Sequence, residues 1–240
     1  MTKFVPGSWV HLTALAICAI SILLYIPIAR RYRLGKLPWL GKAMATACIA
    51  IWLLNTGVAC TPSLFRWDSS LPLFYCNLAN LVGAFAILCE RRIFQSVLYF
   101  WACGLSVWAF LTPTLAFGPN HIGFWIFWAY HLCIGLAVTH LIVGNVYRPN
   151  RRDLLATIAV TIAYGLILVA INVPTGWNYG FLGASRPSSP TPIDLLGPFP
   201  LRLLWIALLA AGIFCILMLP WKIADMRNRK SPTGLSENPS

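Results

Sequence analysis

The sequence predicts an all-α fold, a polytopic membrane bundle of seven transmembrane helices with the N-terminus outside and the C-terminus in the cytoplasm. The first observation is composition: 59% of the residues are hydrophobic and only 10% are charged, against roughly 25% charged in soluble domains. The second is a succession of long apolar stretches, and the third is the placement of basic residues between them. Because lipid offers peptide groups no hydrogen-bond partners, each stretch must be helical.

The apolar stretches set the predicted spans. A span needs about 20 mostly apolar residues to cross a hydrocarbon core about 30 Å thick. The first stretch is predicted to be a span and not a signal peptide, because its apolar run is too long and its basic cluster follows it. The predicted spans are residues 9–29, 40–59, 71–89, 93–113, 122–144, 154–174 and 199–221.

The basic residues set the predicted orientation. The net charge is +12, and fourteen of the eighteen basic residues lie in the first, third and fifth breaks or in the C-terminal tail. By the positive-inside rule these segments are cytoplasmic. The charge therefore indicates topology and contact with anionic headgroups, so we predict membrane lipids as partners and no nucleic acid.

The chain is predicted to form one transmembrane domain, residues 1–221, followed by a disordered cytoplasmic tail, residues 222–240. The eight cysteines show no CxxC or CxxH zinc spacing, so neither a metal nor a cofactor is predicted. The sequence does not indicate an oligomeric state.

Polar residues inside the spans are the main functional signal, because polar groups at membrane depth are costly and tend to face the bundle interior. With the predicted orientation, several fall in the outer half of five different spans. They are His11, Asn55, Cys76, Asn77, Asn80, His131 and Asn172. The longest break, residues 175–198, is predicted to cover the same outer end, and it carries Asn178, Tyr179 and Asp194.

Cys76 and His131 suggest nucleophilic chemistry. Cys76, Asn80 and Gly83 share one stripe of the third span. We expect Cys76 about 8 Å and His131 about 14 Å below the outer ends of their helices. A histidine can take the thiol proton during attack and return it to the leaving group, and an asparagine can donate to the oxyanion. The alternative is that Cys76 is a packing residue and His131 a hydrogen-bonded helix contact.

An ordered set of short motifs runs from about residue 8 to residue 221. They are SWxH (Ser8, Trp9, His11), LPLxxC (Leu71, Pro72, Leu73, Cys76), YFW (Tyr99, Phe100, Trp101), LTP (Leu111, Thr112, Pro113), His121 with His131, YRP (Tyr147, Arg148, Pro149), and Asn172, TGxNY (Thr175, Gly176, Asn178, Tyr179) and DLLGPxP (Asp194, Leu195, Leu196, Gly197, Pro198, Pro200). The set resembles the bacterial YwaF-type integral membrane proteins, which implies the bacterial cytoplasmic membrane as the location.

The resemblance extends more distantly to animal transmembrane cysteine acyltransferases, which move an acyl chain onto lyso-ether-phospholipids. It implies Cys76 as the nucleophile and His131 as the base. Two positions depart from the YwaF-type pattern: Asn77 stands where an Asp is usual, and Leu132 stands where a Gly follows the histidine. The first departure removes an acid that would orient His131.

The leading hypothesis is a cofactor-independent phospholipid acyltransferase or transacylase that uses a Cys76–His131 pair in the outer half of the bundle. A set of residues is expected to bind substrate: His11, Asn77, Asn80, His121, Asn172, Asn178, Tyr179 and Asp194. The alternative is a non-catalytic transporter or receptor for a lipid or small molecule, in which the same polar cluster binds the ligand. A structural partner of another membrane complex is a third possibility.

Overall fold

The computed structural model describes residues 4–185 and 192–230, and the elements within these residues are all helical. The prediction of an all-α polytopic bundle is confirmed. The elements are α1 (Trp9–Arg33), α2 (Leu40–Ala59), α3 (Tyr75–Leu88), α4 (Arg92–Phe100), η1 (Trp101–Ser106), α5 (Trp108–Leu111), α6 (Ile122–Thr139), η2 (His140–Gly144), α7 (Arg151–Thr175), η3 (Tyr179–Phe181), η4 (Pro192–Leu196), α8 (Leu201–Leu217) and α9 (Leu219–Lys230).

Six apolar helical segments of the described chain are long enough to cross a membrane. Two of them contain a short π-helical stretch. η1 joins α4 to α5, and η2 follows α6 directly. The remaining predicted span corresponds to α3, which has 14 residues and so extends only about 21 Å. Against a hydrocarbon core of about 30 Å, α3 stops short of one membrane surface.

The start of α3 differs from the prediction. The span was expected to begin near residue 71, but Leu71 to Phe74 are not helical and α3 begins at Tyr75. Pro72 accounts for Leu71, because proline disfavours helical geometry in the residue before it. Phe74 is extended, with φ −72° and ψ 149°. Non-helical backbone at this depth requires protein around it.

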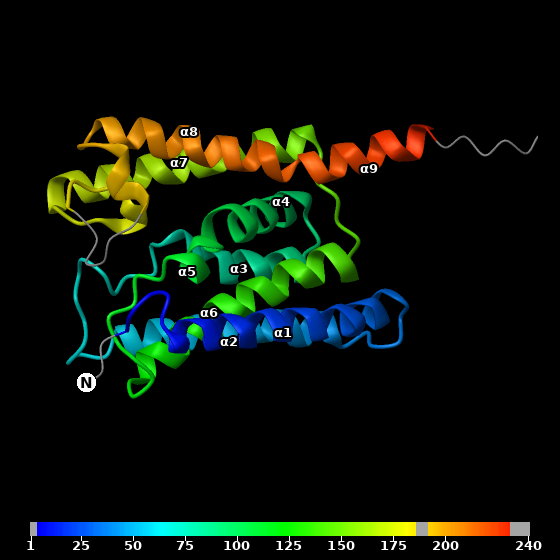
Figure 1. The fold of residues 1–240 in the computed structure, drawn as a ribbon, viewed down its shortest axis with the longest axis horizontal. Coiled ribbons are helices and arrows are strands. Elements are labelled where there is room, and N and C mark those ends of the chain that lie inside the picture. Colours follow the sequence, from blue (N-terminus) through cyan, green and yellow to red (C-terminus); the bar gives the residue numbers. More distant parts are fainter. Residues whose placement is uncertain (1–3, 186–191, 231–240) are drawn as a thin grey trace, which may run out of the picture.

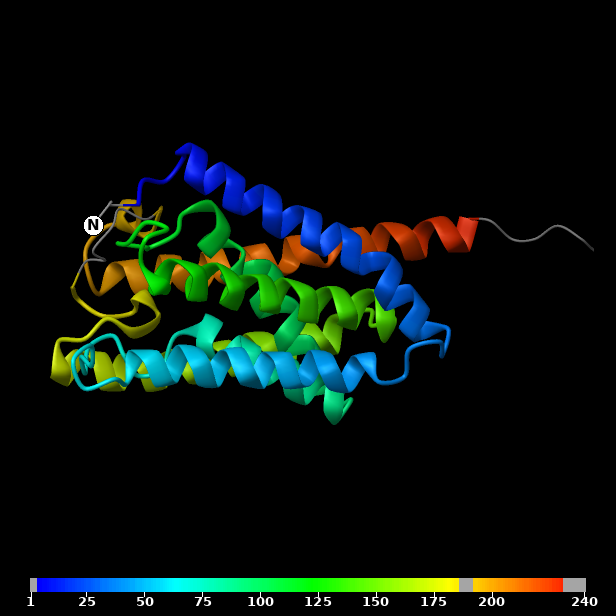
Figure 2. The same ribbon diagram turned by 90° about the horizontal axis from the view of Figure 1, so that it is seen from below.

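Helices α3, α4 and α6 form the centre of the bundle, with α1, α2, α7 and α8 around them (Figure 1). α1 and α2 meet at the connection over residues 34–39 and diverge toward the other end, where α6 lies between them (Figure 2). Figure 1 shows the longer loops at one end of the bundle, with the α1–α2 turn and the end of α9 at the other. The outer faces of α1, α7 and α8 expose leucine and isoleucine side chains, as lipid-facing surfaces do.

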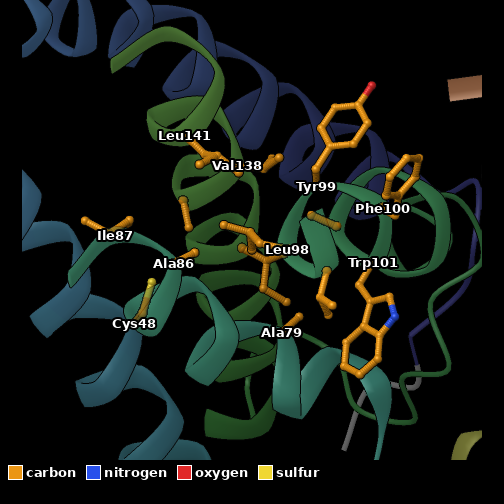
Figure 3. Packing of buried hydrophobic residues seen from close by; sticks show 14 of the residues in the cluster. Cys48, Ala79, Ala86, Ile87, Leu98, Tyr99, Phe100, Trp101, Val138 and Leu141 are labelled. Atoms are coloured by element: carbon orange, nitrogen blue, oxygen red, sulfur yellow. The ribbon is translucent and has the colours of Figure 1, made fainter. Parts of the chain in front are cut away.

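Small residues allow the central helices to approach closely (Figure 3). Ala79 and Ala86 of α3 are fully buried beside Leu98 of α4. A Cβ atom on Gly83 would lie 3.4 Å from Ala137 Cβ and 3.6 Å from Cys48 Sγ, so three helices meet at this glycine. Such small-residue packing replaces the hydrophobic driving force that is missing between helices in lipid.

A bidentate ion pair fastens α4 to α7 at the end that the charge pattern assigns to the cytoplasm. Arg92 Nη2 and Nε donate to the Asp153 carboxylate at 2.7 and 2.8 Å. Asp153 also accepts from the backbone N–H of Asn150, whose side chain in turn caps α7. The buried carboxylate is therefore paired on two sides, which is the condition for burying a charge without a large penalty.

The C-terminal segment differs from the prediction of disorder from residue 222. α9 continues the helical path of α8 to Lys230, and residues 222–230 contain neither proline nor glycine to interrupt it. The rest of the predicted tail, residues 231–240, lies outside the described part of the chain.

Two native cysteines test the predicted orientation. Cys60 ends α2 and Cys89 ends α3, and both are exposed at opposite ends of the bundle. With the N-terminus outside, a membrane-impermeant maleimide applied to intact cells is expected to label Cys60 and to reach Cys89 only after permeabilisation. Mass spectrometry of the labelled peptides, with Cys60→Ser and Cys89→Ser as controls, measures this. Labelling of Cys89 alone in intact cells would show that the N-terminus is in the cytoplasm, opposite to the predicted orientation.

Candidate functional site

Cys76 lies in the first turn of α3. It is the second residue of the helix and half-buried, so the expected depth of about 8 Å below the helix end was wrong. The partial positive charge of a helix N-terminus stabilises an anion placed there, and cysteines at such positions gain thiolate character. The thiol donates to Asn77 Oδ1 at 3.7 Å, a weak hydrogen bond. The position favours a reactive thiol and offsets part of the cost of burying its charged form.

Tyr130 joins the start of α3 to α6. Its hydroxyl donates to the Asn77 carbonyl oxygen at 2.9 Å, and its own carbonyl accepts from Asn80 Nδ2 at 3.3 Å. Both bonds hold the first turns of α3, which carry Cys76, against Tyr130, and Tyr130 directly precedes His131 on α6. Asn80 is fully buried, and its Oδ1 has no hydrogen-bond partner in the described residues. A buried acceptor without a partner is unusual in a folded protein.

His131 is held in one tautomer. Its Nδ1 lies 2.8 Å from the Phe127 carbonyl oxygen. Since a carbonyl only accepts, Nδ1 carries the proton and donates, and Nε2 has the lone pair. Nε2 makes no hydrogen bond within the described residues. The ring is buried against Phe127 and Phe110, with centroids 4.4 and 6.1 Å away. An oriented imidazole with an available Nε2 is the form that a general base requires.

Cys76 and His131 come from neighbouring helices, α3 and α6, which Tyr130 links. Within the described residues no hydrogen bond joins the thiol to the imidazole. The pair therefore stays a prediction. Hydrogen bonds of this kind are often long without substrate and tighten in its complex.

His11 uses both ring nitrogens to fasten the start of α1. Nδ1 accepts from the Gly7 N–H at 2.9 Å, so Nε2 is protonated and donates to the Phe110 carbonyl at 2.8 Å. Its ring also lies 5.7 Å from that of Trp128 on α6. The Phe110 ring in turn lies beside His131. His11 therefore positions Phe110, whose ring packs beside His131, and both of its own ring nitrogens are already hydrogen-bonded.

His121 caps α6. Its Nδ1 accepts from the Gly123 N–H at 3.0 Å, and its ring stacks on Phe117 at 4.1 Å. It lies ten positions before His131, which corresponds to about 15 Å along the helix. The observed contacts of His121 belong to the helix end and not to the surroundings of Cys76.

The loop after α7 holds the segment before α3. Asn172 binds the backbone of Tyr179 twice, since Nδ2 donates to its carbonyl at 2.8 Å and Oδ1 accepts from its N–H at 3.0 Å. The Tyr179 hydroxyl donates to the Trp67 carbonyl at 2.7 Å and accepts from the Leu71 N–H at 3.0 Å. Burial raises the pKa of the Tyr179 phenol, which keeps it protonated as a donor.

Two further predicted residues lie within this loop. Asn178 binds the Ser185 carbonyl and the Gly183 N–H, both at 2.8 Å. Asp194 lies in η4, ahead of α8. Arg202 of α8 donates to the carbonyls of Gly183 and Ser185. Asn172, Asn178 and Tyr179 thus form a scaffold that positions the start of α3.

Nothing in the sequence indicated a role for three residues in the outer half. Tyr130 links the two helices, and two others have buried polar atoms without a partner in the described chain, Ser106 Oγ and Trp128 Nε1. Trp128 precedes His131 by three residues, so the helical period placed it on the same side of α6. Two cavities, of about 450 and 440 Å³, lie at the opposite end of the bundle and not beside Cys76.

A family model for the TMEM164 family matches residues 6–218, which is most of the chain and includes every helix from α1 to α8. The chain belongs to the TMEM164 family. The family match agrees with the predicted more distant relation to animal transmembrane proteins. Membership in the TMEM164 family agrees with the six long apolar helices in identifying an integral membrane protein. Among curated proteins and among solved structures, none matches the chain.

Proposed function

We propose that this TMEM164-family protein transfers an acyl chain from a phospholipid to a lysophospholipid. The observation that carries the proposal is a thiol in the first turn of α3, fastened through Tyr130 to the turn of α6 whose histidine has its Nε2 lone pair available. A nucleophile at a helix N-terminus and an oriented base on the adjacent helix are the two groups that thiol acyl transfer requires.

In the first half-reaction the Cys76 thiol gives its proton to His131 Nε2, and the thiolate attacks the ester carbonyl of the donor. The tetrahedral intermediate expels the lysophospholipid alkoxide, which takes the proton back from His131, and a thioester remains on Cys76. Asn80 Nδ2 has a second N–H beyond the one that donates to Tyr130, and we assign it to the oxyanion. Asn77 is the second candidate donor.

In the second half-reaction the hydroxyl of the acceptor lysophospholipid gives its proton to His131 and attacks the thioester. The Cys76 thiolate leaves and regains that proton. Ester and thioester exchange without net oxidation or hydrolysis, so the cycle needs no cofactor. His11, His121, Asn172, Asn178, Tyr179 and Asp194 act by positioning the helices and loops that form the substrate site.

Membrane depth supports a lipid substrate. α3 begins below the surface that it faces, under loops held by Tyr179, so Cys76 lies at the level where the ester groups and upper acyl chains of a phospholipid lie. The charge pattern assigns this end to the outside. We propose that substrates enter from the outer leaflet, and that the protein is a YwaF-type relative in the bacterial cytoplasmic membrane.

Trapping of the acyl-enzyme tests the proposal. The purified chain in nanodiscs is incubated with a phospholipid that has an alkyne-tagged acyl chain, and the attached chain is detected by conjugation to a fluorophore. We expect a hydroxylamine-sensitive label on Cys76 that is lost in Cys76→Ala and discharged by lysophospholipid. Cys103→Ala is the matched control, because Cys103 is also half-buried in a transmembrane segment. Labelling that is equal in Cys76→Ala and wild type would refute the mechanism.

The second candidate is a non-catalytic transporter or receptor for a lipid or small molecule. The unpartnered buried polar atoms of Asn80, Ser106 and Trp128, together with the absence of a Cys76–His131 hydrogen bond in the described chain, are what a binding pocket also shows. The transporter or receptor hypothesis predicts saturable binding of lysophospholipid, which persists in Cys76→Ala, and it predicts that no acyl-enzyme forms.

A further inference from the structure

A cavity of about 450 Å³ lies at the end of the bundle that the charge pattern assigns to the cytoplasm. It is formed by the last turn of α1, the segment that follows η2, and the start of α9. Three arginines line it, Arg30, Arg33 and Arg148. Arg30 and Arg33 are three residues apart on α1, so they share one face of the helix.

Among the residues that the structure describes, no carboxylate lines this cavity. The ion pairs between described residues join Arg66 to Asp68 and Arg92 to Asp153, neither of which involves the three arginines. Three positive groups around one cavity repel one another unless an anion lies between them. Planar guanidinium groups bind phosphate oxygens in bidentate fashion, so phosphate is the anion that fits best.

The surrounding contacts fix one arginine before any ligand arrives. The Arg148 guanidinium lies over the Trp221 ring, 5.9 Å from its centroid. Trp221 Nε1 donates to the Tyr99 hydroxyl at 2.8 Å, which fixes the ring. The Arg148 backbone carbonyl accepts from Arg92 Nη2 at 3.0 Å, so the main chain is also held in place. A positioned cation loses less conformational entropy when it binds an anion than a free surface arginine does.

The remaining walls are apolar. Ile142 and Val143 of η2, Leu34 after α1 and the Trp221 ring line the cavity beside the arginines. A soluble phosphate gains nothing from such walls, whereas a phospholipid places its phosphate among the arginines and the first part of its acyl chains along the aliphatic side chains. The cavity also lies where the apolar α1 ends in its basic cluster, the level at which the charge pattern places the membrane surface and so a lipid phosphate.

We propose that this cavity is a binding site for the headgroup phosphate of an anionic phospholipid in the cytoplasmic leaflet. The site is independent of the acyl-transfer proposal, since Cys76 and His131 lie in the opposite half of the bundle. A lipid bound in the cavity would contact both α1 and the start of α9 and so hold them together. The protein would then bind lipid at both membrane surfaces, as substrate on the outer side and as a structural ligand on the cytoplasmic side.

Native mass spectrometry of the full chain in detergent tests the site, with phosphatidylglycerol as the probe. We expect saturable binding of one lipid that is at least tenfold weaker in the variant Arg30→Gln, Arg33→Gln, Arg148→Gln. The control is Arg31→Gln, Lys36→Gln, Lys42→Gln, which removes the same charge from exposed positions outside the cavity and is expected to change binding less than twofold. Equal losses in both triple variants would overturn the proposal in favour of general charge attraction.

Two further comparisons separate the source of the phosphate from folding effects. Phosphatidylcholine is expected to bind at least tenfold more weakly than phosphatidylglycerol, and inorganic phosphate is expected not to displace the bound lipid at equal concentration. Displacement by inorganic phosphate, or equal binding of the two lipids, would refute an anionic lipid site. Val143→Trp fills the cavity and leaves all three arginines in place, so loss of binding with an unchanged melting temperature attributes the effect to the cavity and not to unfolding.

Discussion

Replacing His131 with asparagine is expected to lower the rate of acyl transfer by about 100- to 10,000-fold, the range for loss of a general base. The asparagine Nδ2 replaces the imidazole Nδ1–H and keeps the bond to the Phe127 carbonyl, so the helix stays intact. What the variant lacks is the Nε2 lone pair. The Cys76 thiol then has no group to take its proton, and the leaving alkoxide has none to return it.

Acyl transfer in nanodiscs, measured as the turnover of a labelled donor, gives the rate, and the melting temperature reports the fold. His140→Asn is the matched control, because His140 is also a buried histidine of the fifth span, with Nδ1 2.9 Å from the Tyr25 hydroxyl at the opposite end. It is expected to change stability without a selective loss of turnover. Equal losses of turnover in the two variants would assign His131 a packing role.

The membrane bundle was predictable because its physical cause is visible in composition. Apolar length determines which segments cross lipid, and basic residues beside them determine orientation. The start of α3 was harder, since Leu71 to Phe74 are as apolar as the helix that follows. Only Pro72 marks the break. The error matters for chemistry, because it moves Cys76 from the interior of a helix to its first turn.

The sequence identified which residues are buried polar groups, but not whether each one contacts a substrate or the protein backbone. A buried polar side chain that faces a substrate and one that binds a neighbouring backbone look the same in sequence. His11 and Asn172 proved to bind backbone groups with both of their polar atoms. Tyr130 was overlooked because aromatic residues in spans usually pack, and its two bonds to α3 depend on a helix pairing that only the fold provides.

Replacing Asn172 with alanine is expected to lower the free energy of unfolding by about 2–4 kcal/mol, because the buried Tyr179 N–H loses its partner and the Tyr179 carbonyl keeps only the bond from the Leu182 N–H. The melting temperature in nanodiscs measures the loss. Asn178→Ala is the control, since Asn178 also binds two backbone groups of the loop, but one of these bonds is exposed to solvent. Its expected cost is about 1 kcal/mol, the value of an ordinary hydrogen bond.

The same substitution separates a positioning role from substrate binding. Release of Tyr179 frees the Leu71 N–H that its hydroxyl holds, so hydrogen exchange is expected to rise at residues 71–76, and turnover falls because Cys76 is less well positioned. A positioning residue lowers kcat together with stability. Unchanged stability and exchange, with only a raised KM for the lysophospholipid, would instead mean that the Asn172 amide contacts substrate directly, as the sequence alone suggested.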